Sequence, residues 1–311
     1  MPNGGVIKLG ELGEFGLIGT LRSWLPAGPA VLTGIGDDAA VLAAPDGRVV
    51  ATTDFLIEDR HFRRDWSSSS DVGHKAAARS LADIAAMGAV PTGLLVALAA
   101  PPDLPVSWLR GLASGLAREC ARAGASVAGG DTSQAPFVLL AVTGLGDLQG
   151  RAPVLRSGAR PGDVVAVAGP LGHAAAGLAL LSAGLPGPAG LIQAQLRPSP
   201  PYDAGPEAAA LGATAMIDVS DGLLADLGHV AEASDVLIDV FAEPLIRTNG
   251  GGTVSLADIL TGGEDHSLAA TFPAGVGLPA RWTVIGSVSE GHGVTVDGKP
   301  YQGPAGWEHF R

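Results

Sequence analysis

The sequence predicts an α/β fold, layered in the α+β manner and divided into two domains. Apolar runs of strand length alternate along the chain with longer segments whose apolar residues recur at helical spacing. With 311 residues, the chain is long enough for two domains of ordinary size. A stretch rich in glycine, proline and charge interrupts the alternation near the middle of the chain. We therefore expect each half to bury a core of its own.

The first half of the chain predicts alternating strands and helices. Its strands are expected at residues 48–53, 94–98, 126–128 and 137–145, and its helices at residues 71–88 and 108–122. The apolar face of the first helix carries Ala76, Ser80, Ile84 and Met87. Gly124 ends the second helix as a C-cap would, and the strand that follows is expected to stop at Gly129 and Gly130. This order is typical of a layered sheet domain.

The domain boundary is expected within residues 146–162, the segment rich in glycine, proline and charge. We place the first domain at residues 1–147 and the second at residues 148–311. The second domain repeats the alternation, with strands expected at 164–168, 214–219 and 282–285, a helix of small residues at 172–182 and an amphipathic helix after 222. No period is clean enough to indicate an internal repeat.

Charge excludes one class of partner and leaves another open. The formal net charge of -12 disfavours a nucleic-acid partner, because binding to a phosphate backbone requires basic surface. The same acidic excess suits bound cations, but a solvated acidic surface explains it equally well. The positions of the acidic residues therefore carry more information than their number.

Cysteine content and hydropathy indicate the compartment. The single cysteine, Cys120, leaves no intramolecular disulfide and no cysteine-based zinc site, which favours a reducing cytoplasm. The first residues lack the basic and apolar regions of a signal peptide. No apolar run reaches the roughly 20 residues that a membrane-spanning helix requires. We therefore expect a cytoplasmic protein with no membrane partner.

Acidic residues follow apolar strands or glycine pairs at five places. These are Gly36-Asp37-Asp38, Thr52-Thr53-Asp54, Gly129-Gly130-Asp131, Asp218-Val219-Ser220-Asp221 and Gly262-Gly263-Glu264-Asp265. Carboxylates at strand ends project into the crevice where open α/β sheets bind ligands, and glycines let backbone amides approach an anion. Mg²⁺ prefers such oxygen ligands. Each turn taken singly is also ordinary helix-cap or turn chemistry, so only the whole set indicates a multi-metal site.

Asp83 differs from this set because it lies inside a predicted helix, one turn after Arg79. It is either half of an exposed ion pair with Arg79 or a metal ligand presented toward Asp54, and its spacing fits both. The sequence contains no P-loop and no protein-kinase signature, so bound ATP would be held through metals and backbone amides. Neither a Gly-x-Ser-x-Gly elbow nor a His-x-x-x-His pair supports a hydrolase or a zinc enzyme.

The acidic turns belong to a longer series of motifs. In chain order these are Gly-Ile-Gly-Asp-Asp-Ala-Ala-Val-Leu (34–42), Thr-Thr-Asp (52–54), His-Phe (61–62), Asp-Ile-Ala-Ala-Met-Gly-Ala (83–89), Gly-Gly-Asp-Thr (129–132), Arg-Ser-Gly-Ala-Arg-Pro-Gly-Asp (156–163), Ile-Asp-Val-Ser-Asp-Gly-Leu (217–223) and Gly-Gly-Glu-Asp (262–265). The series resembles the thiamine-monophosphate kinase family over nearly the whole chain. This family belongs to a superfamily of ATP-using enzymes that includes aminoimidazole ribonucleotide synthetase and selenophosphate synthetase.

The resemblance implies a fold and a reaction. It implies an N-terminal domain that binds ATP and magnesium and pairs its sheet with that of a second subunit, followed by a C-terminal α/β domain. A homodimer is therefore expected. The implied reaction is phosphorylation of thiamine monophosphate by ATP to give thiamine diphosphate. Transfer would be direct and in line, assisted by several Mg²⁺ ions, with no covalent catalytic residue.

The resemblance also implies roles for particular residues. The metal ligands would be Asp38, Thr52, Thr53, Asp54, Asp83, Asp131, Asp218 and Asp221. The nucleotide would be contacted by Gly130, Asp131, Arg156 and Ser220, and thiamine phosphate by His61, Glu264 and Trp307. Without the resemblance, we would interpret His61 as a surface histidine and Trp307 as an apolar residue that anchors the core or the chain terminus. The chain departs from the family pattern at His266-Ser267 and at Ser133-Gln134, which concerns substrate and phosphate contacts.

Two alternatives to this reaction remain. The chain could be another ATP-dependent synthetase of the same superfamily, which activates an amide or carbamoyl oxygen by phosphorylation. It could also be a non-catalytic dimer that binds nucleotide or senses metal, although the full set of aspartates argues against that class. ATP turnover that depends on thiamine monophosphate separates all three.

Overall fold

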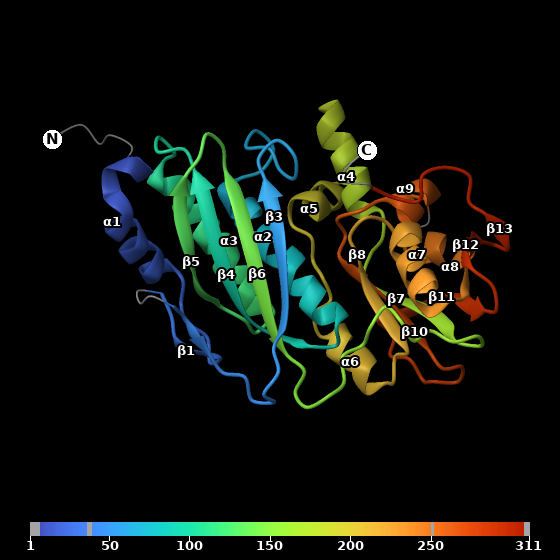
Figure 1. Ribbon diagram of the computed structural model, residues 1–311. Helices are drawn as coiled ribbons and strands as arrows, with labels where there is room; N and C mark the ends of the chain where they lie inside the picture. Colours follow the sequence, from blue (N-terminus) through green and yellow to red (C-terminus); the bar gives the residue numbers. More distant parts are fainter. Residues whose placement is uncertain (1–6, 36–38, 250–251, 308–311) are drawn as a thin grey trace. The chain divides into compact units, whose positions relative to one another are not determined.

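The computed structural model describes residues 7–35, 39–249 and 252–307. The chain forms two compact units (Figure 1). The N-terminal unit comprises Met1–Ile84 and Pro91–Gln149, and the C-terminal unit comprises Ala85–Val90 and Gly150–Arg311. Each unit combines sheet and helices, so the mixed α/β architecture predicted from the sequence is confirmed. No helix in the described ranges is long and apolar enough to cross a lipid bilayer.

A four-stranded sheet forms the centre of the N-terminal unit. Its strands lie in the order β3 (Val50–Ile57), β6 (Leu139–Asp147), β4 (Val90–Ala100) and β5 (Val127–Gln134). β3 and β6 are antiparallel, whereas β4 and β5 are parallel. Strands β3 and β5 therefore occupy opposite edges of the sheet. A small ribbon of β1 (Val31–Thr33) and β2 (Val41–Leu42) is separate from this sheet.

Two helices, α2 (Ser69–Ala86) and α3 (Val106–Arg122), cover one face of this sheet (Figure 1). Glycines allow these two helices to approach closely. A Cβ atom on Gly73 would lie 2.1 Å from Leu112 O, and one on Gly115 would lie 2.2 Å from Ser70 O. Helix α1 (Leu9–Trp24) packs against α3 beside β5. The helical layer thus fixes which sheet face is buried.

The opposite face of the same sheet is uncovered within the described part of the unit. Along β3, Ala51, Thr53 and Phe55 are exposed, and Phe55 retains 57% of its accessible surface. The residues between them point toward α2, because successive side chains of a strand alternate between faces. Thr52 and Asp54 are therefore on the helix-covered face and Thr53 is on the open face.

The C-terminal unit is built on a seven-stranded sheet. Its order is β13 (Lys299–Pro300), β12 (Gly293–Val296), β9 (Leu237–Val240), β11 (Trp282–Ser289), β7 (Val164–Ala168), β10 (Ser267–Phe272) and β8 (Ala215–Val219). β12 and β9 are parallel, and the other pairs are antiparallel. The unit also contains α4 (His173–Ala183), α5 (Ala189–Leu196), α6 (Ala204–Ala210), α7 (Leu223–Ser234), α8 (Ala242–Thr248) and α9 (Leu256–Thr261).

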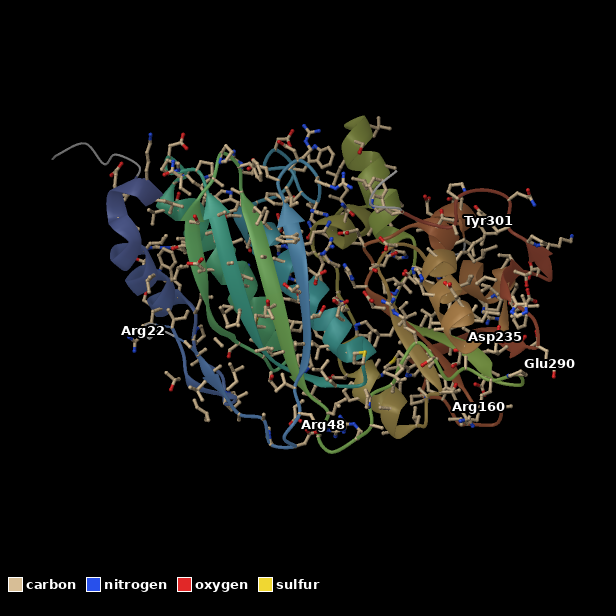
Figure 2. The ribbon with its side chains drawn as sticks, viewed as in Figure 1. Arg22, Arg48, Arg160, Asp235, Glu290 and Tyr301 are labelled. Carbon is tan, nitrogen blue, oxygen red and sulfur yellow. The ribbon has the colours of Figure 1, made fainter. Side chains whose placement is uncertain are left out.

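The core of this unit positions Asp218. Ile217 and Val219 of β8 are buried in an apolar cluster with Leu223 and Leu227 of α7. Asp218 lies between the first two residues and so projects from the other face of the strand. Charged side chains are exposed at the surface of each unit, as Figure 2 shows for labelled residues such as Arg160.

At two acidic segments, the expected strand ends were wrong. The strand expected to stop at Gly129 and Gly130 continues as β5 to Gln134. A Cβ atom on Gly130 would lie 1.8 Å from Val96 O, so glycine here permits close strand approach and does not mark a turn. The strand expected to end at Thr53 likewise continues through Asp54 to Ile57. Two of the five acidic segments therefore lie wholly within strands.

Candidate active site

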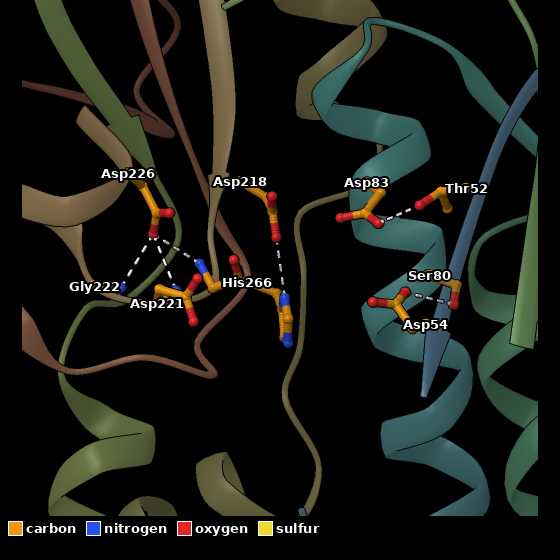
Figure 3. Close-up of polar contacts among 10 residues, drawn as sticks. Thr52, Asp54, Ser80, Asp83, Asp218, Asp221, Gly222, Asp226 and His266 are labelled. Atoms are coloured by element: carbon orange, nitrogen blue, oxygen red, sulfur yellow. Dashed lines mark hydrogen bonds and ion pairs between the residues drawn. The ribbon is translucent and has the colours of Figure 1, made fainter. Parts of the chain in front are cut away.

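In the N-terminal unit, β3 and α2 bring three sequence-predicted residues together. Thr52 Oγ1 donates a 2.6 Å hydrogen bond to Asp83 Oδ2 (Figure 3). Asp54, two residues along the same face of β3, also points toward α2. Thr53 points to the opposite face, where its hydroxyl lies 3.3 Å from Thr143 Oγ1. The structure therefore groups Thr52, Asp54 and Asp83 but separates Thr53 from them.

Ser80 is a member of this group that motif reasoning missed. Its Oγ donates a 2.8 Å hydrogen bond to Asp54 Oδ2 and lies 3.2 Å from Val142 O. The side chain is fully buried. A polar residue on the apolar face of the predicted helix, one turn before Asp83, was the signal that could have identified it.

The other candidates of the N-terminal unit lie elsewhere. Gly130 and Asp131 are on β5, at the edge opposite β3, and three strand spacings amount to roughly 14 Å. Asp131 is exposed, and its Oδ1 accepts a 2.8 Å hydrogen bond from Thr132 N. His61 lies beyond the end of β3. Asp38 lies outside the described residues. A single chain thus does not bring Asp131 beside Asp54.

The hydrogen bond of His61 identifies its tautomer. Its Nδ1 accepts a 3.0 Å hydrogen bond from Ile57 N. A nitrogen that accepts cannot carry the proton, so the neutral ring carries it on Nε2. His61 is partly exposed and is held by this backbone contact. It can therefore present an N–H donor to a ligand.

The N-terminal unit also contains a cavity of about 790 Å³. Residues of α1, α3, β4 and β5 contribute to its lining, which is mostly apolar and includes Leu21, Leu109 and Leu116. Gly130 and Asp131 contribute to the same lining. Pockets of this size and apolar character are typical of small-molecule sites. The two residues expected to contact nucleotide thus line a space large enough for one.

In the C-terminal unit, the segment after β8 forms a tightly bonded turn. Asp226 Oδ2 accepts hydrogen bonds of 3.0, 3.1 and 3.1 Å from the N–H groups of Ser220, Asp221 and Gly222 (Figure 3). Burial, and then the charge of Asp218, raises the pKa of Asp226 to about 7. The turn was expected to offer its amides to an anionic ligand, and instead it donates them to its own carboxylate.

The segment 262–266 is bonded to this turn. Glu264 N donates to Ser220 O at 2.9 Å, and His266 N donates to Val219 O at 3.0 Å. Both donors have left-handed backbones, with φ of 72° at Glu264 and 52° at His266. Non-glycine residues in this region are uncommon and occur more often at functional sites. The hydrogen bonds to β8 and its turn hold this strained segment in place.

Two side chains add to the connection between these segments. His266 Nδ1 lies 3.2 Å from Asp218 Oδ2, and both side chains are buried (Figure 3). Asp265 accepts hydrogen bonds of 2.6 Å from Gly172 N and 2.8 Å from Ala174 N, at the start of α4. His266, which departs from the family pattern, is thus a neighbour of a predicted metal ligand.

The backbone near the end of the described chain joins the same turn. Trp307 N donates a 2.9 Å hydrogen bond to Asp221 O. A Cβ atom on Gly306 would lie 2.4 Å from that oxygen, so glycine is required for this approach. Hydrogen bonds therefore connect five predicted residues of this unit, namely Asp218, Ser220, Asp221, Glu264 and Trp307.

Arg156 is bonded to other parts of the unit. The neighbouring Leu155 O accepts from Met216 N at 3.0 Å, near the start of β8. Arg156 O accepts a 3.1 Å hydrogen bond from Ser234 Oγ, at the end of α7. These contacts fix the backbone of Arg156 at the opposite end of β8 from the acidic turn, and its side chain is exposed.

The donor chemistry fits magnesium. Among the described residues, no three histidine, cysteine, aspartate or glutamate side chains are grouped so that they could hold a metal by themselves. Mg²⁺ does not require such a group, because it commonly binds one or two carboxylates together with substrate phosphates and water. Asp54 and Asp83 with Thr52 in one unit, and Asp218 and Asp221 in the other, are such oxygen donors.

Comparison with known proteins identifies the family. The family model for AIR synthase related protein, N-terminal domain, matches residues 36–148. Thiamine-monophosphate kinase of Mycobacterium tuberculosis is 48% identical over 311 residues, which cover 97% of this chain and 93% of that protein. The chain belongs to the thiamine-monophosphate kinase family. The Corynebacterium glutamicum thiamine-monophosphate kinase is 39% identical and covers 97% of this chain and 95% of its own length.

Solved structures of thiamine-monophosphate kinases share the fold. The Stenotrophomonas maltophilia enzyme is 34% identical, with a TM-score of 0.79 and coverage of 92% of this chain and 97% of its own. AaThiL in complex with AMPPCP and TMP is 36% identical, with a TM-score of 0.79 and coverage of 98% and 99%. The hydrogenase maturation protein HypE in complex with ATP is 19% identical with a TM-score of 0.67, which shows a shared fold only. The chain is therefore a kinase with the fold predicted from its motifs.

Proposed function

We propose that this kinase phosphorylates thiamine monophosphate with ATP to give thiamine diphosphate. The observation that carries the proposal is the connected turn in the C-terminal unit. Backbone hydrogen bonds join Trp307 to Asp221 and Glu264 to Ser220, so two predicted substrate contacts meet the turn that carries a predicted metal ligand. The carboxylate of Asp218, a second predicted ligand, contacts the same segment through the His266 side chain. Relatives named thiamine-monophosphate kinase reach 48% identity, and AaThiL has been solved with an ATP analogue and TMP.

We assign ATP and metal binding and dimerisation to the first domain, residues 1–147, with residues 148–311 as the second. The apolar cavity beside Gly130 and Asp131 supports nucleotide binding in the first, because an adenine base is flat and largely apolar. Ser220 in the second domain would contact nucleotide through its hydroxyl, since its N–H donates to Asp226. Arg156 would reach nucleotide from an exposed position.

Several Mg²⁺ ions would be held by the carboxylates of both domains. The proposed ligands are those expected from the sequence: Asp38, Thr52, Thr53, Asp54, Asp83, Asp131, Asp218 and Asp221. Bound Mg²⁺ would offset the repulsion between two anionic substrates. The protein's own contribution is orientation, since Thr52 bonds to Asp83 and Ser80 bonds to Asp54. In-line transfer needs no strong base, because a phosphate nucleophile is already ionised at neutral pH.

Three residues would recognise thiamine monophosphate. The indole of Trp307 is 58% exposed, so its face can stack on the aromatic rings of thiamine, one of which is cationic. Glu264 adds a carboxylate close to the same turn. His61 would donate from Nε2 to the phosphate, in the tautomer set by Ile57 N. The three residues thus match the aromatic, cationic and anionic parts of the substrate.

The open sheet face supports a homodimer. Phe55, at 57% exposure, and Thr53 lie on a face that no helix of the described part covers. A large exposed aromatic residue on a sheet face is typical of an interaction surface. Asp131 and Asp54 lie at opposite edges of one sheet, so a second copy offers a way to complete a metal site that needs both.

We place the enzyme in the cytoplasm. Its single cysteine, Cys120, is 1% exposed. Burial raises the pKa of its thiol to about 12, so the thiolate needed for redox chemistry is scarce at neutral pH. The chain therefore relies on no disulfide, which is typical of proteins from reducing compartments.

Product analysis tests the proposed reaction. Purified protein is incubated with ATP, Mg²⁺ and thiamine monophosphate, and nucleotides and thiamine phosphates are separated by chromatography. We expect one thiamine diphosphate and one ADP for each ATP consumed. ATP consumption that releases inorganic phosphate without thiamine diphosphate would instead support an amide-activating synthetase. The absence of any turnover would favour a non-catalytic nucleotide-binding dimer.

A further inference from the structure

One buried carboxylate organises the acidic turn of the C-terminal unit. We infer that Asp226 is a positioning residue, which holds the turn after Asp218, and with it Asp221, for cation binding by gathering three successive backbone N–H groups on one oxygen. This inference rests on the proposed function of those two aspartates as magnesium ligands. Asp226 itself is 3% exposed and lies in the first turn of α7.

The geometry explains how one side chain holds the turn. Ser220, Asp221 and Gly222 donate to Asp226 Oδ2 at 3.0, 3.1 and 3.1 Å. Asp226 N donates in return to Gly222 O at 2.9 Å, which makes the contact reciprocal. A row of successive amides pointing at one oxygen is the geometry of a typical anion site. The protein fills that anion site with its own side chain.

The same turn connects the neighbouring candidates. Asp221 O accepts from Trp307 N, and Ser220 O accepts from Glu264 N. The amides of Ser220 and Asp221 face Asp226, while their carbonyls face the other two segments. A shift of the turn would therefore displace Asp221, Glu264 and Trp307 together.

A helix cap with no functional role is the competing explanation, and matched variants separate the two. Asp226→Asn retains one oxygen acceptor but replaces the other carboxyl oxygen by an amide nitrogen, whereas Asp226→Ala leaves three N–H groups without their acceptor. Asp163→Asn is the control. Asp163 is a buried aspartate of the same unit that accepts from Arg160 N at 2.9 Å and from Thr214 Oγ1 at 2.6 Å.

Cation binding is measured directly, in the full-length protein. Mn²⁺ binding is followed by electron paramagnetic resonance without nucleotide or thiamine phosphate, and thermal unfolding is recorded without metal. We expect the apparent Mn²⁺ dissociation constant to rise about 10-fold or more in Asp226→Ala and a few-fold in Asp226→Asn. Asp163→Asn should bind Mn²⁺ as the wild type does, even if its unfolding temperature falls.

The outcomes decide between the explanations. Wild-type Mn²⁺ affinity and wild-type Mg²⁺ dependence of turnover in Asp226→Asn would overturn the inference, and this mild variant decides alone if Asp226→Ala does not fold. Weakened Mn²⁺ binding with the control unchanged would support it. If the proposed reaction is wrong, the wild-type incubation yields no thiamine diphosphate. Mn²⁺ binding can still be measured in that case, so the two failures are distinguishable.

Discussion

Ser80 Oγ on α2 donates a 2.8 Å hydrogen bond to Asp54 Oδ2 on β3. Ser80 is fully buried, so solvent water cannot replace Asp54 as the acceptor of its hydroxyl hydrogen. It determines which oxygen of Asp54 turns toward the helix. Hydrogen bonds from neighbouring side chains orient metal-binding carboxylates in other proteins in this way.

Replacement of Ser80 by alanine should reduce kcat by about 10-fold. The hydrogen bond that orients Asp54 is lost, while the change in size is small, so the cost in unfolding free energy should be only about 1 kcal/mol. Thr92→Val is the matched control, because Thr92 Oγ1 donates to Leu145 O at 3.1 Å in the same sheet. Equal kcat values in both variants would show that Ser80 has no special role.

Asp54→Asn and Asp218→Asn should each lower kcat by about 100-fold or more. Each variant retains the size of the side chain and loses a negatively charged oxygen donor. Thermal unfolding without Mg²⁺ should change less than turnover, because neither substitution alters apolar packing, although Asp218→Asn also changes the buried contact with His266. Steady-state kinetics over a range of Mg²⁺ concentrations makes the measurement. Unchanged kinetics in both variants would exclude these residues as magnesium ligands.

Local pattern was sufficient to predict the element types and the acidic candidates. Alternation along β3 and helical spacing along α2 could be recognised from neighbouring residues alone. The position of Asp83 stayed open between an ion pair with Arg79 and a ligand presented toward Asp54, and its hydrogen bond from Thr52 is known only from the structure. The family resemblance was confirmed by relatives that match nearly the whole chain.

Contacts between residues far apart in the chain could not be predicted from the pattern of neighbouring residues. Gly130 appeared to end a strand, and only the approach of Val96 O explains why glycine lies inside β5. The distance of Asp131 from Asp54 depends on the strand order, which no short segment encodes. In the sequence, Asp226 has the spacing of an ordinary polar residue on an amphipathic helix. The three N–H groups that it accepts from lie in the preceding turn, whose backbone conformation the sequence pattern does not reveal.

Phe55→Glu should convert the proposed homodimer to a monomer. The side chain lies on the open face of the sheet, so a charge there should disrupt subunit contact without disturbing the core. Sedimentation velocity at micromolar concentration makes the measurement. Leu185→Glu is the control, because Leu185 is similarly exposed, at 58%, in the C-terminal unit. A Phe55→Glu protein with the wild-type sedimentation coefficient would contradict this interface.

Trp307→Leu should raise the KM for thiamine monophosphate about 10-fold, which corresponds to the loss of about 1.4 kcal/mol of stacking energy. The KM for ATP should stay near the wild-type value. Trp307→Phe retains an aromatic face and should show a smaller rise. The backbone bond from Trp307 N to Asp221 O is kept in both variants. Equal rises in both KM values would indicate a displaced turn and not lost stacking.

The stability of the fold should depend on the ionisation of Asp265. Burial raises the pKa of this carboxyl from 3.8 to about 7, against the opposing effect of the Ala174 and Gly172 N–H groups. The folded state therefore binds the proton more tightly than the unfolded chain does. Its contribution to stability is complete below about pH 4 and is lost as the pH rises through about 7.

Asp265→Asn should remove this dependence on pH. Relative to the variant, the wild type should lose on the order of 4 kcal/mol of unfolding free energy between pH 4 and pH 7. Urea denaturation of both proteins at intervals from pH 4 to pH 8 makes the measurement. The Asn side chain can accept from only one of the two N–H groups, which adds an offset that does not vary with pH. Asp226 contributes the same slope to both proteins, so the difference between the curves isolates Asp265. Parallel curves would mean that Asp265 is ionised across this range in the folded state.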